Sequence, residues 1–205
     1  MVPSRRAPLD RWCVSLAFFL SGAAALIYQV AWQRLLFVVV GVDLESVTIV
    51  VSTFMLGLGL GALLGGWIAD AMPRRILLVF CMFECGIGLF GLNSADLILS
   101  MSEALAGVSR AGAALASFLV LLFPTVCMGA TLPMLVADAF QDTRNVGLAT
   151  GVLYFINTIG AATGALAVGF VLFYWMDTRQ AVGAAALLNF AASIAVGLVY
   201  VRRRR

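Results

Sequence analysis

The chain has 205 residues, of which 63% are of hydrophobic types and only 11% are charged, with a formal net charge of +3. Its mean hydropathy of +1.06 lies far above that of water-soluble domains, which need more polar side chains to coat their surfaces. This composition excludes a soluble enzyme and a nucleic-acid-binding domain, and it indicates an integral membrane protein.

Six apolar segments follow one another along the chain. Each is long enough to cross the hydrocarbon core of a bilayer, which takes about 20 apolar residues in a helix. Short connections separate the segments and hold most of the charged residues. We therefore predict an all-α integral membrane protein with a single six-helix domain over residues 1–205. The predicted spans are 12–40, 46–69, 76–97, 111–137, 147–175 and 181–201.

The arginines predict the orientation of these spans. With a cytoplasmic N-terminus, ten arginines lie in the cytoplasm and two lie outside, while Arg34 falls within the first span. The positive-inside rule then places both termini in the cytoplasm. The inside set is Arg5, Arg6, Arg11, Arg74, Arg75, Arg144 and Arg202 to Arg205, and the outside set is Arg110 and Arg179.

The first apolar segment has an alternative interpretation as a signal peptide. Three arginines precede it, and it passes through the small residues Ala23–Ala25, which resemble a cleavage site. However, the apolar run continues without a break to Val40, and cleavage would put the arginine-rich connections outside. We therefore expect the segment to remain as a membrane-spanning helix.

Polar and aromatic residues recur within the first span. Tyr28 and Trp32 are four residues apart, and so are Gln29 and Gln33, so the two pairs form stripes on adjoining faces of one helix. Arg34 lies beside them, toward the outer end of the span. This pattern makes all five residues candidates for a substrate or proton site.

The second and fifth spans contain glycines at four-residue spacing. Gly57, Gly61 and Gly65 form one series in the second span, and the fifth span contains Gly147 and Gly151 and then Gly160 and Gly164. Small residues at this spacing let two helices approach closely in lipid. The pattern predicts tight packing and says little about chemistry.

Glu84 is an acidic residue near the middle of the third span. A charge at this depth is costly, so it is a functional-site hypothesis by default. One interpretation pairs Glu84 with Arg34 or with a glutamine and so locks two helices together. The other makes Glu84 a proton or cation site that lines a polar cavity.

The last three spans contain further polar and helix-bending residues. Pro124 and Pro133 predict a bend in the fourth span, either as structural accommodation or as part of a moving element, and nearby threonines are expected to satisfy the freed carbonyls. Asn157 and Asn189 are expected to donate hydrogen bonds between helices. Asn157 is also retained as a substrate-site candidate.

No catalytic constellation is present in the sequence. Histidine is absent, and no strand, glycine-rich loop and helix follow one another as a nucleotide-binding unit. Cys81 and Cys85 share a helix face, but two thiols alone make a poor metal site. We therefore expect no enzymatic activity, no metal and no cofactor; an intramembrane enzyme is the least supported interpretation.

The turn after the second span resembles a known gate element. The segment from Gly66 to Arg75 contains Asp70 four residues after the glycine, followed by Arg74 and Arg75. It resembles the loop between helices two and three of major facilitator superfamily transporters, although Pro73 stands where that family favours glycine. The resemblance implies a charge relay of these three residues at the cytoplasmic gate.

A second resemblance covers nearly the whole chain and includes five ordered blocks. It is to the membrane domain of some bacterial spermidine-synthase-like proteins, which itself is similar to half of a major facilitator fold. The soluble aminopropyltransferase domain of those proteins has no counterpart in these 205 residues, so no catalytic residue carries over. The blocks are Ser21–Leu35, Phe54–Gly61, Glu84–Leu89, Met128–Pro133 and Leu153–Gly160.

Two functions follow as expectations from this resemblance. The first is a half-transporter of the bacterial inner membrane that works as a homodimer by alternating access, is coupled to protons or cations, and carries a polyamine or another small cation. The second is a non-transporting anchor or scaffold for a separately encoded soluble synthase. The lipid bilayer is a partner in both, and nucleic acid in neither.

Overall fold

The structure, a computed structural model, describes residues 8–41, 43–105 and 107–204. Arg5, Arg6 and Arg205 of the predicted cytoplasmic set lie outside these residues. Every described element is helical. The elements are α1 (Pro8–Val40), α2 (Asp43–Ala71), α3 (Ile76–Ala104), α4 (Arg110–Thr143), α5 (Val146–Ala167), the π-helix η1 (Val168–Leu172), α6 (Phe173–Trp175) and α7 (Thr178–Arg204).

Six of these helical segments are long and apolar enough to cross a membrane, and α5, η1 and α6 together form the fifth. The all-helical fold is therefore confirmed, with six helical segments of the length and apolar composition that a membrane span requires. The helices run beyond the predicted ends, most clearly α3, which continues from Leu97 to Ala104. Hydropathy drops at the first charged residues, whereas the backbone hydrogen-bond pattern of a helix continues through them.

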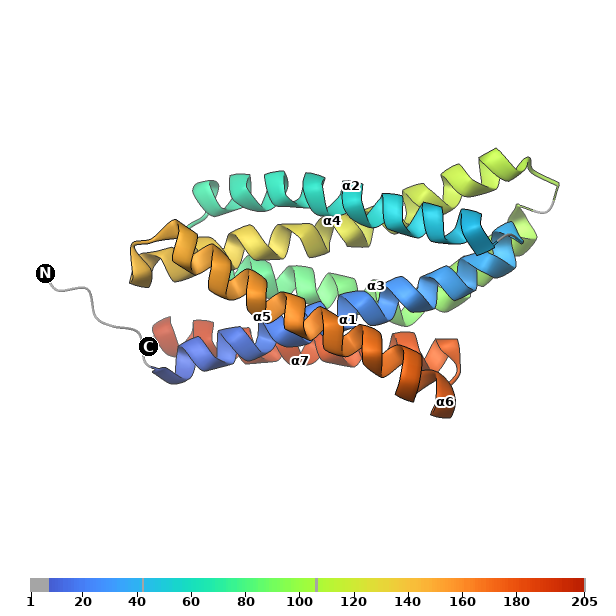
Figure 1. The fold of residues 1–205 in the computed structure, drawn as a ribbon. Helices are drawn as coiled ribbons and strands as arrows, with labels where there is room; N and C mark the ends of the chain where they lie inside the picture. The colour runs from blue at the N-terminus through green and yellow to red at the C-terminus, as the bar shows by residue number, and fades with distance from the viewer. Residues whose placement is uncertain (1–7, 42, 106, 205) are drawn as a thin grey trace, which may run out of the picture.

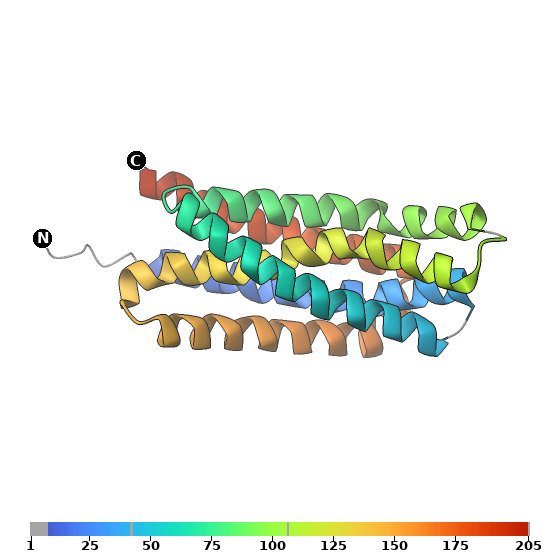
Figure 2. The same ribbon diagram turned by 90° about the horizontal axis from the view of Figure 1, so that it is seen from above.

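The six segments form a bundle in which α1 and α4 are central (Figures 1 and 2). Figure 2 shows α3 and α7 along one side and α5 along the other. The start of α1 and the end of α7 lie at the same end of the bundle, as an even number of spans requires (Figure 1). We call this the terminal end and the other the far end.

The helices pair in a pattern that relates the first three spans to the last three. α1 packs mainly against α5 and α7, while α4 packs mainly against α2 and α3; α3 also packs against α7. The two halves correspond helix by helix: α1 to α4, α2 to α5 and α3 to α7. The pair α1–α5 then corresponds to α4–α2, and the pair α1–α7 corresponds to α4–α3. Because α1 begins at the terminal end and α4 begins at the far end (Figure 1), the two three-helix units run in opposite directions.

Glycines make the contact between α2 and α4. Gly57, Gly61 and Gly65 all face α4, and a methyl group added at any of them would collide with it. At Gly61 the collision involves backbone atoms from Val126 onward, and at Gly65 it involves the backbone of Ala130. The predicted close approach of the second span to a neighbour is confirmed.

The contact between α5 and α1 is built in the same way. A methyl group at Gly160 would collide with the backbone of Phe19, and one at Gly164 with the backbone of Ala23. Gly151, in contrast, has no neighbouring atom within 4 Å of the position where a Cβ would lie. The two related helix pairs therefore use the same device, close backbone approach over glycine.

α4 runs as one helix through both Pro124 and Pro133. A proline leaves the carbonyl four residues before it without its helical hydrogen bond. Thr125 and Thr131 are expected to donate to these carbonyls, but their hydroxyls donate to other carbonyls of α4, so this expectation is wrong. Their hydroxyls donate to the carbonyls of Leu121 (3.0 Å), Leu122 (2.9 Å) and Met128 (2.7 Å).

Charged side chains mark the two ends of the bundle. Asp10 contacts Arg203 at the terminal end, and Asp96 contacts Arg179 at the far end. Along α7, Arg179 and Arg203 are roughly 36 Å apart at 1.5 Å per residue, slightly more than the hydrocarbon thickness of about 30 Å. Among the described residues, Glu84 is the one charged side chain that lies well between these levels.

Candidate functional site

The two aromatic candidates of α1 lie in the core. Tyr28 and Trp32 are fully buried, and their rings stack with centroids 4.9 Å apart. Trp32 Nε1 donates a 2.9 Å hydrogen bond to Ser94 Oγ on α3. The Tyr28 hydroxyl lies against Gly91 and has no hydrogen-bond partner among the described residues. In this conformation both rings join α1 to α3, and neither faces an accessible surface.

The other members of the stripe lie nearer the surface. Gln29 and Gln33 are half-buried, and Arg34 is exposed. The Arg34 guanidinium lies over the ring of Phe173 on α6, with its carbon 4.1 Å from the ring centroid. The polar and aromatic stripes of α1 thus separate, as their different helix faces require: the rings enter the core, while the amides and the guanidinium remain near the surface.

Glu84 joins three helices. It is fully buried, and each carboxylate oxygen accepts one 2.7 Å hydrogen bond, Oε1 from Ser21 Oγ on α1 and Oε2 from Asn189 Nδ2 on α7. The interpretation that pairs Glu84 with Arg34 or a glutamine is therefore wrong about the partner. The expectation that Asn189 donates between helices is confirmed.

A polar seam continues from Glu84 along the contact between α3 and α7. Ser193 Oγ donates to the Cys81 carbonyl at 3.0 Å and lies 3.2 Å from Cys85 Sγ. Asn189 Oδ1 is buried without a hydrogen-bond partner among the described residues. Within the described part of the chain, no three His, Cys, Asp or Glu side chains come together as a metal site.

Asn157 also makes the interhelical hydrogen bond expected of it. Its Nδ2 donates to the Phe18 carbonyl on α1 at 3.1 Å, and the backbone and amide of Asn157 fill the space beside Gly22. The side chain is half-buried. In this conformation it contributes to the contact between α5 and α1.

The predicted gate residues lie at the terminal end, in and around the turn that joins α2 to α3. Asp70, Arg74 and Arg75 are all exposed. Their side chains form no ion pair or hydrogen bond with the described residues. A charge relay among these three residues is therefore not formed within one chain, and their role in a gate stays a prediction.

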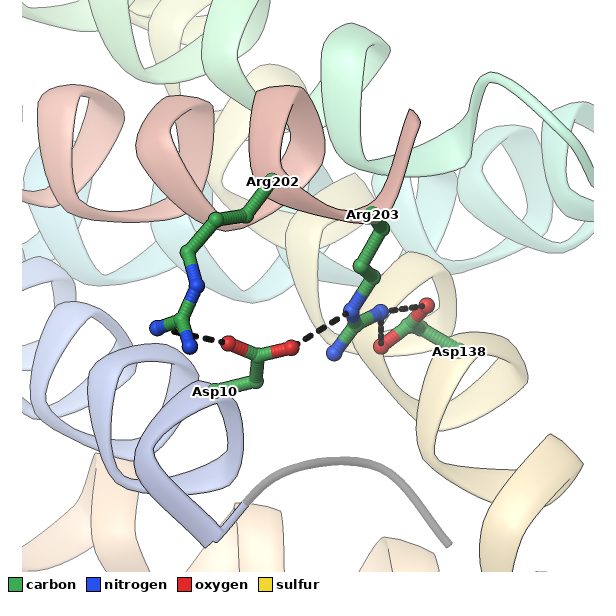
Figure 3. Close-up of polar contacts among 4 residues, drawn as sticks. All are labelled: Asp10, Asp138, Arg202 and Arg203. Carbon is green, nitrogen blue, oxygen red and sulfur yellow. Dashed lines mark hydrogen bonds and ion pairs between the residues drawn. The ribbon is translucent and has the colours of Figure 1, made fainter. Parts of the chain in front are cut away.

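An ion-pair network that was not predicted from the sequence lies at the terminal end (Figure 3). Arg203 Nη1 donates to both carboxylate oxygens of Asp138, at 3.0 and 3.1 Å, and Arg203 Nε donates to Asp10 at 3.4 Å. Arg202 approaches the other oxygen of Asp10 at 3.5 Å. One arginine of α7 thus joins the start of α1 to the end of α4. The signal was available, since both aspartates are predicted on the side of the arginine tail.

A cavity of about 170 Å³ lies beside this network, between α1, α4, α5 and α7. Arg11, Asp138, Asp142 and Arg203 supply its charged lining, and residues such as Leu153 supply its apolar lining. The cavity places a small mixed-charge space at the end of the bundle where the predicted gate residues also lie.

Arg203 and Arg202 differ in environment and so give a matched pair of variants. We expect Arg203→Ala to lower the free energy of unfolding by about 1 to 2 kcal/mol, between the values typical of exposed and of buried ion pairs. Arg202→Ala should change it by less than about 0.5 kcal/mol, because that side chain is 58% exposed and solvent screens its charge. Thermal unfolding in detergent measures both. Equal effects would show that the network does not hold the helix ends.

One relative is similar over nearly the whole chain. A polyamine aminopropyltransferase of Corynebacterium efficiens is 28% identical over 204 residues, which cover 98% of this chain and 38% of that protein. This chain thus spans well under half the length of that relative. No family model matches the chain, and no solved structure matches it. The relative agrees with the resemblance to spermidine-synthase-like proteins, whereas the likeness to half of a major facilitator transporter stays a prediction.

Proposed function

We propose that this protein is a small-molecule transporter of the bacterial inner membrane that works as a homodimer of half-transporters. The observation that carries the proposal is the pairing of two oppositely directed three-helix units, α1 with α5 and α4 with α2. Inverted repeats of this kind are typical of secondary transporters and occur within each half of a major facilitator protein. The arginine asymmetry supports cytoplasmic termini.

The surface of the bundle supports pairing with a second copy. α2 and the α5 segment are the least buried of the six spans, and Gln29 of the central helix α1 is only half-buried. An amide is costly against lipid tails, so a second copy that covers α1, α2 and α5 would give it a polar surrounding. Two copies would then supply twelve helices around a shared cavity that opens alternately to each side.

A polyamine or another small cation is the substrate class that the relative's name suggests. Glu84 is the described carboxylate at membrane depth, and it is fully buried between α1, α3 and α7. A cation or proton therefore reaches Glu84 only if these helices move apart. Alternating access supplies such a movement, because one part of the bundle rocks against another.

Proteoliposomes test this proposal. The purified chain should take up labelled spermidine under an imposed pH gradient, at a rate several-fold above protein-free liposomes, and crosslinking in native membranes should give a dimer. Collapse of the gradient with an ionophore should remove the uptake. Monomers alone, together with no gradient-dependent uptake, would rule out the homodimeric transporter.

The second candidate is a membrane anchor or scaffold for a soluble synthase, with no transport of its own. The observation that favours it is the similarity to a polyamine aminopropyltransferase, whose remaining length has no match in this chain. An anchor predicts that an aminopropyltransferase co-purifies with the chain and that liposomes show no uptake. In neither role do we propose enzymatic activity for these 205 residues.

A further inference from the structure

Arg34 differs from Arg179, another arginine near the far end of the bundle, in the contacts of its guanidinium. Arg34 lies about 36 Å along α1 from Asp10 at 1.5 Å per residue, which places it at the level of Arg179. There Arg179 pairs with Asp96. Arg34 forms no ion pair or hydrogen bond with the described residues, and its guanidinium lies over the ring of Phe173.

The N–H donors of Arg34 form no hydrogen bond with the described residues. A cation–π contact such as that with Phe173 needs no hydrogen bond, so the five N–H donors of the guanidinium stay available for another partner. The side chain is exposed, so these donors are accessible. Stacking also restricts the side chain, so less entropy is lost when a ligand binds.

The backbone before Phe173 is unusual. η1 is a π-helix, in which the Phe173 N–H donates to the carbonyl of Val168 five residues earlier. Val168 is fully buried, and the wide turn shifts the side chains that follow it around the helix axis relative to a regular α-helix. Short π-helical turns inside α-helices occur frequently at functional sites. Here the turn comes directly before the ring that supports Arg34.

Two exposed aromatic residues follow Phe173 on α6. Tyr174 and Trp175 are 78% and 77% exposed, and they contact each other edge to face with centroids 5.0 Å apart. Exposed Tyr and Trp are typical of the level of lipid headgroups. Arg34 therefore lies where a phosphate group is abundant and where a soluble anion first meets the bundle.

We propose that Arg34, supported by Phe173, binds a phosphate or carboxylate group at the far end of the bundle. A planar guanidinium with free donors recognises such groups through two parallel hydrogen bonds. The anion belongs either to a lipid headgroup or to a soluble molecule. The site does not depend on transport, and binding alone tests it.

The test compares Arg34→Gln with Arg179→Gln in the full chain. Both variants remove one positive charge at the same level, but the guanidinium of Arg179 is already paired with the carboxylate of Asp96. Native mass spectrometry of the delipidated protein, titrated with phosphatidylglycerol, should show about tenfold weaker binding for Arg34→Gln and a change within about twofold for Arg179→Gln. Arg34→Lys should have an intermediate affinity for phosphatidylglycerol, because lysine keeps the positive charge but cannot form the two parallel hydrogen bonds of a guanidinium.

A second arm separates the two sources of the anion. Inorganic phosphate is titrated by calorimetry into the protein in phosphatidylcholine nanodiscs. Binding that Arg34→Gln removes would identify a soluble anion, whereas an effect confined to phosphatidylglycerol would identify a lipid headgroup; either result supports the site. The proposal is overturned if Arg34→Gln binds both probes as the unchanged chain does, or if Arg179→Gln loses as much binding.

Discussion

Replacement of Gly61 or Gly65 by alanine should separate α2 from α4 and strongly destabilise the bundle. A Cβ at Gly65 would collide with the backbone of Ala130, and one at Gly61 with backbone atoms of Val126, Gly129 and Ala130. Backbone atoms cannot rotate away as a flexible side chain can, so the whole helix must shift. Overpacking of this kind costs about 1 to 3 kcal/mol, and we expect the upper part of that range.

The same helix supplies the controls. Gly59 and Gly66 have no neighbouring atom within 4 Å of a Cβ position, so alanine there adds a methyl group to open space. Thermal unfolding in detergent should show a clear loss for Gly61→Ala and Gly65→Ala, and an unchanged or slightly raised midpoint for Gly59→Ala and Gly66→Ala, since alanine favours helix over glycine. If all four variants unfold alike, the glycines do not determine how closely α2 approaches α4.

The six spans follow from the sequence because the bilayer imposes a simple length rule. Each apolar run has the length that lipid requires, and glycine spacing within a run indicates a close contact. The sequence does not say which helix is the neighbour. Gly61 and Gly65 mark one face of α2, but only the three-dimensional arrangement shows that α4 covers it.

The candidate site could be predicted only in part for a related reason. Helical periodicity separates Tyr28 and Trp32 from Gln29 and Gln33, yet it does not reveal which stripe enters the core. Glu84 is recognisable as an unusual residue at membrane depth. Its partner Ser21 could not be identified from the sequence, because serines are common in apolar segments. A serine hydroxyl in a helix can also donate to a backbone carbonyl of the preceding turn, so it does not require a partner on another helix.

Buried polar side chains are concentrated in the contact between α3 and α7. Glu84, Asn189 and Ser193 all lie where α3 meets α7, whereas α1 meets α5 and α4 meets α2 mainly over small residues. Hydrogen bonds fix a particular register between helices, since a slip leaves polar groups unpaired in lipid. The α1–α5 contact contains one such bond, from Asn157 Nδ2 to the Phe18 carbonyl at 3.1 Å, and the α2–α4 contact contains one of 3.4 Å, from Thr125 Oγ1 to the Thr53 carbonyl. Separation of α2 or α5 from its neighbour therefore breaks fewer interhelical hydrogen bonds than separation of α3 from α7.

Glu84→Ala should destabilise the protein, whereas Glu84→Gln should not. Alanine removes the acceptors of Ser21 and Asn189, and it leaves a cavity and a buried amide without a partner. Interhelical hydrogen bonds in membranes contribute about 0.6 kcal/mol on average, and an unpaired buried polar group costs about 1 to 3 kcal/mol. We expect a loss of about 2 to 4 kcal/mol in thermal unfolding. Glutamine keeps the shape and an acceptor, so its loss should stay below about 1 kcal/mol.

The glutamine variant then separates a structural role from a role in transport. It cannot release or take up a proton, yet it keeps three helices joined through Ser21 and Asn189. If Glu84 is the coupling site, Glu84→Gln folds and dimerises normally, but gradient-driven spermidine uptake falls at least about tenfold in proteoliposomes. Ser21→Ala serves as the control, since it weakens the same cluster and leaves the carboxyl group in place. If Glu84→Gln still takes up spermidine, Glu84 is a structural link between α1, α3 and α7 and not the coupling site. If the Glu84→Gln chain fails to fold, the role of Glu84 is also structural.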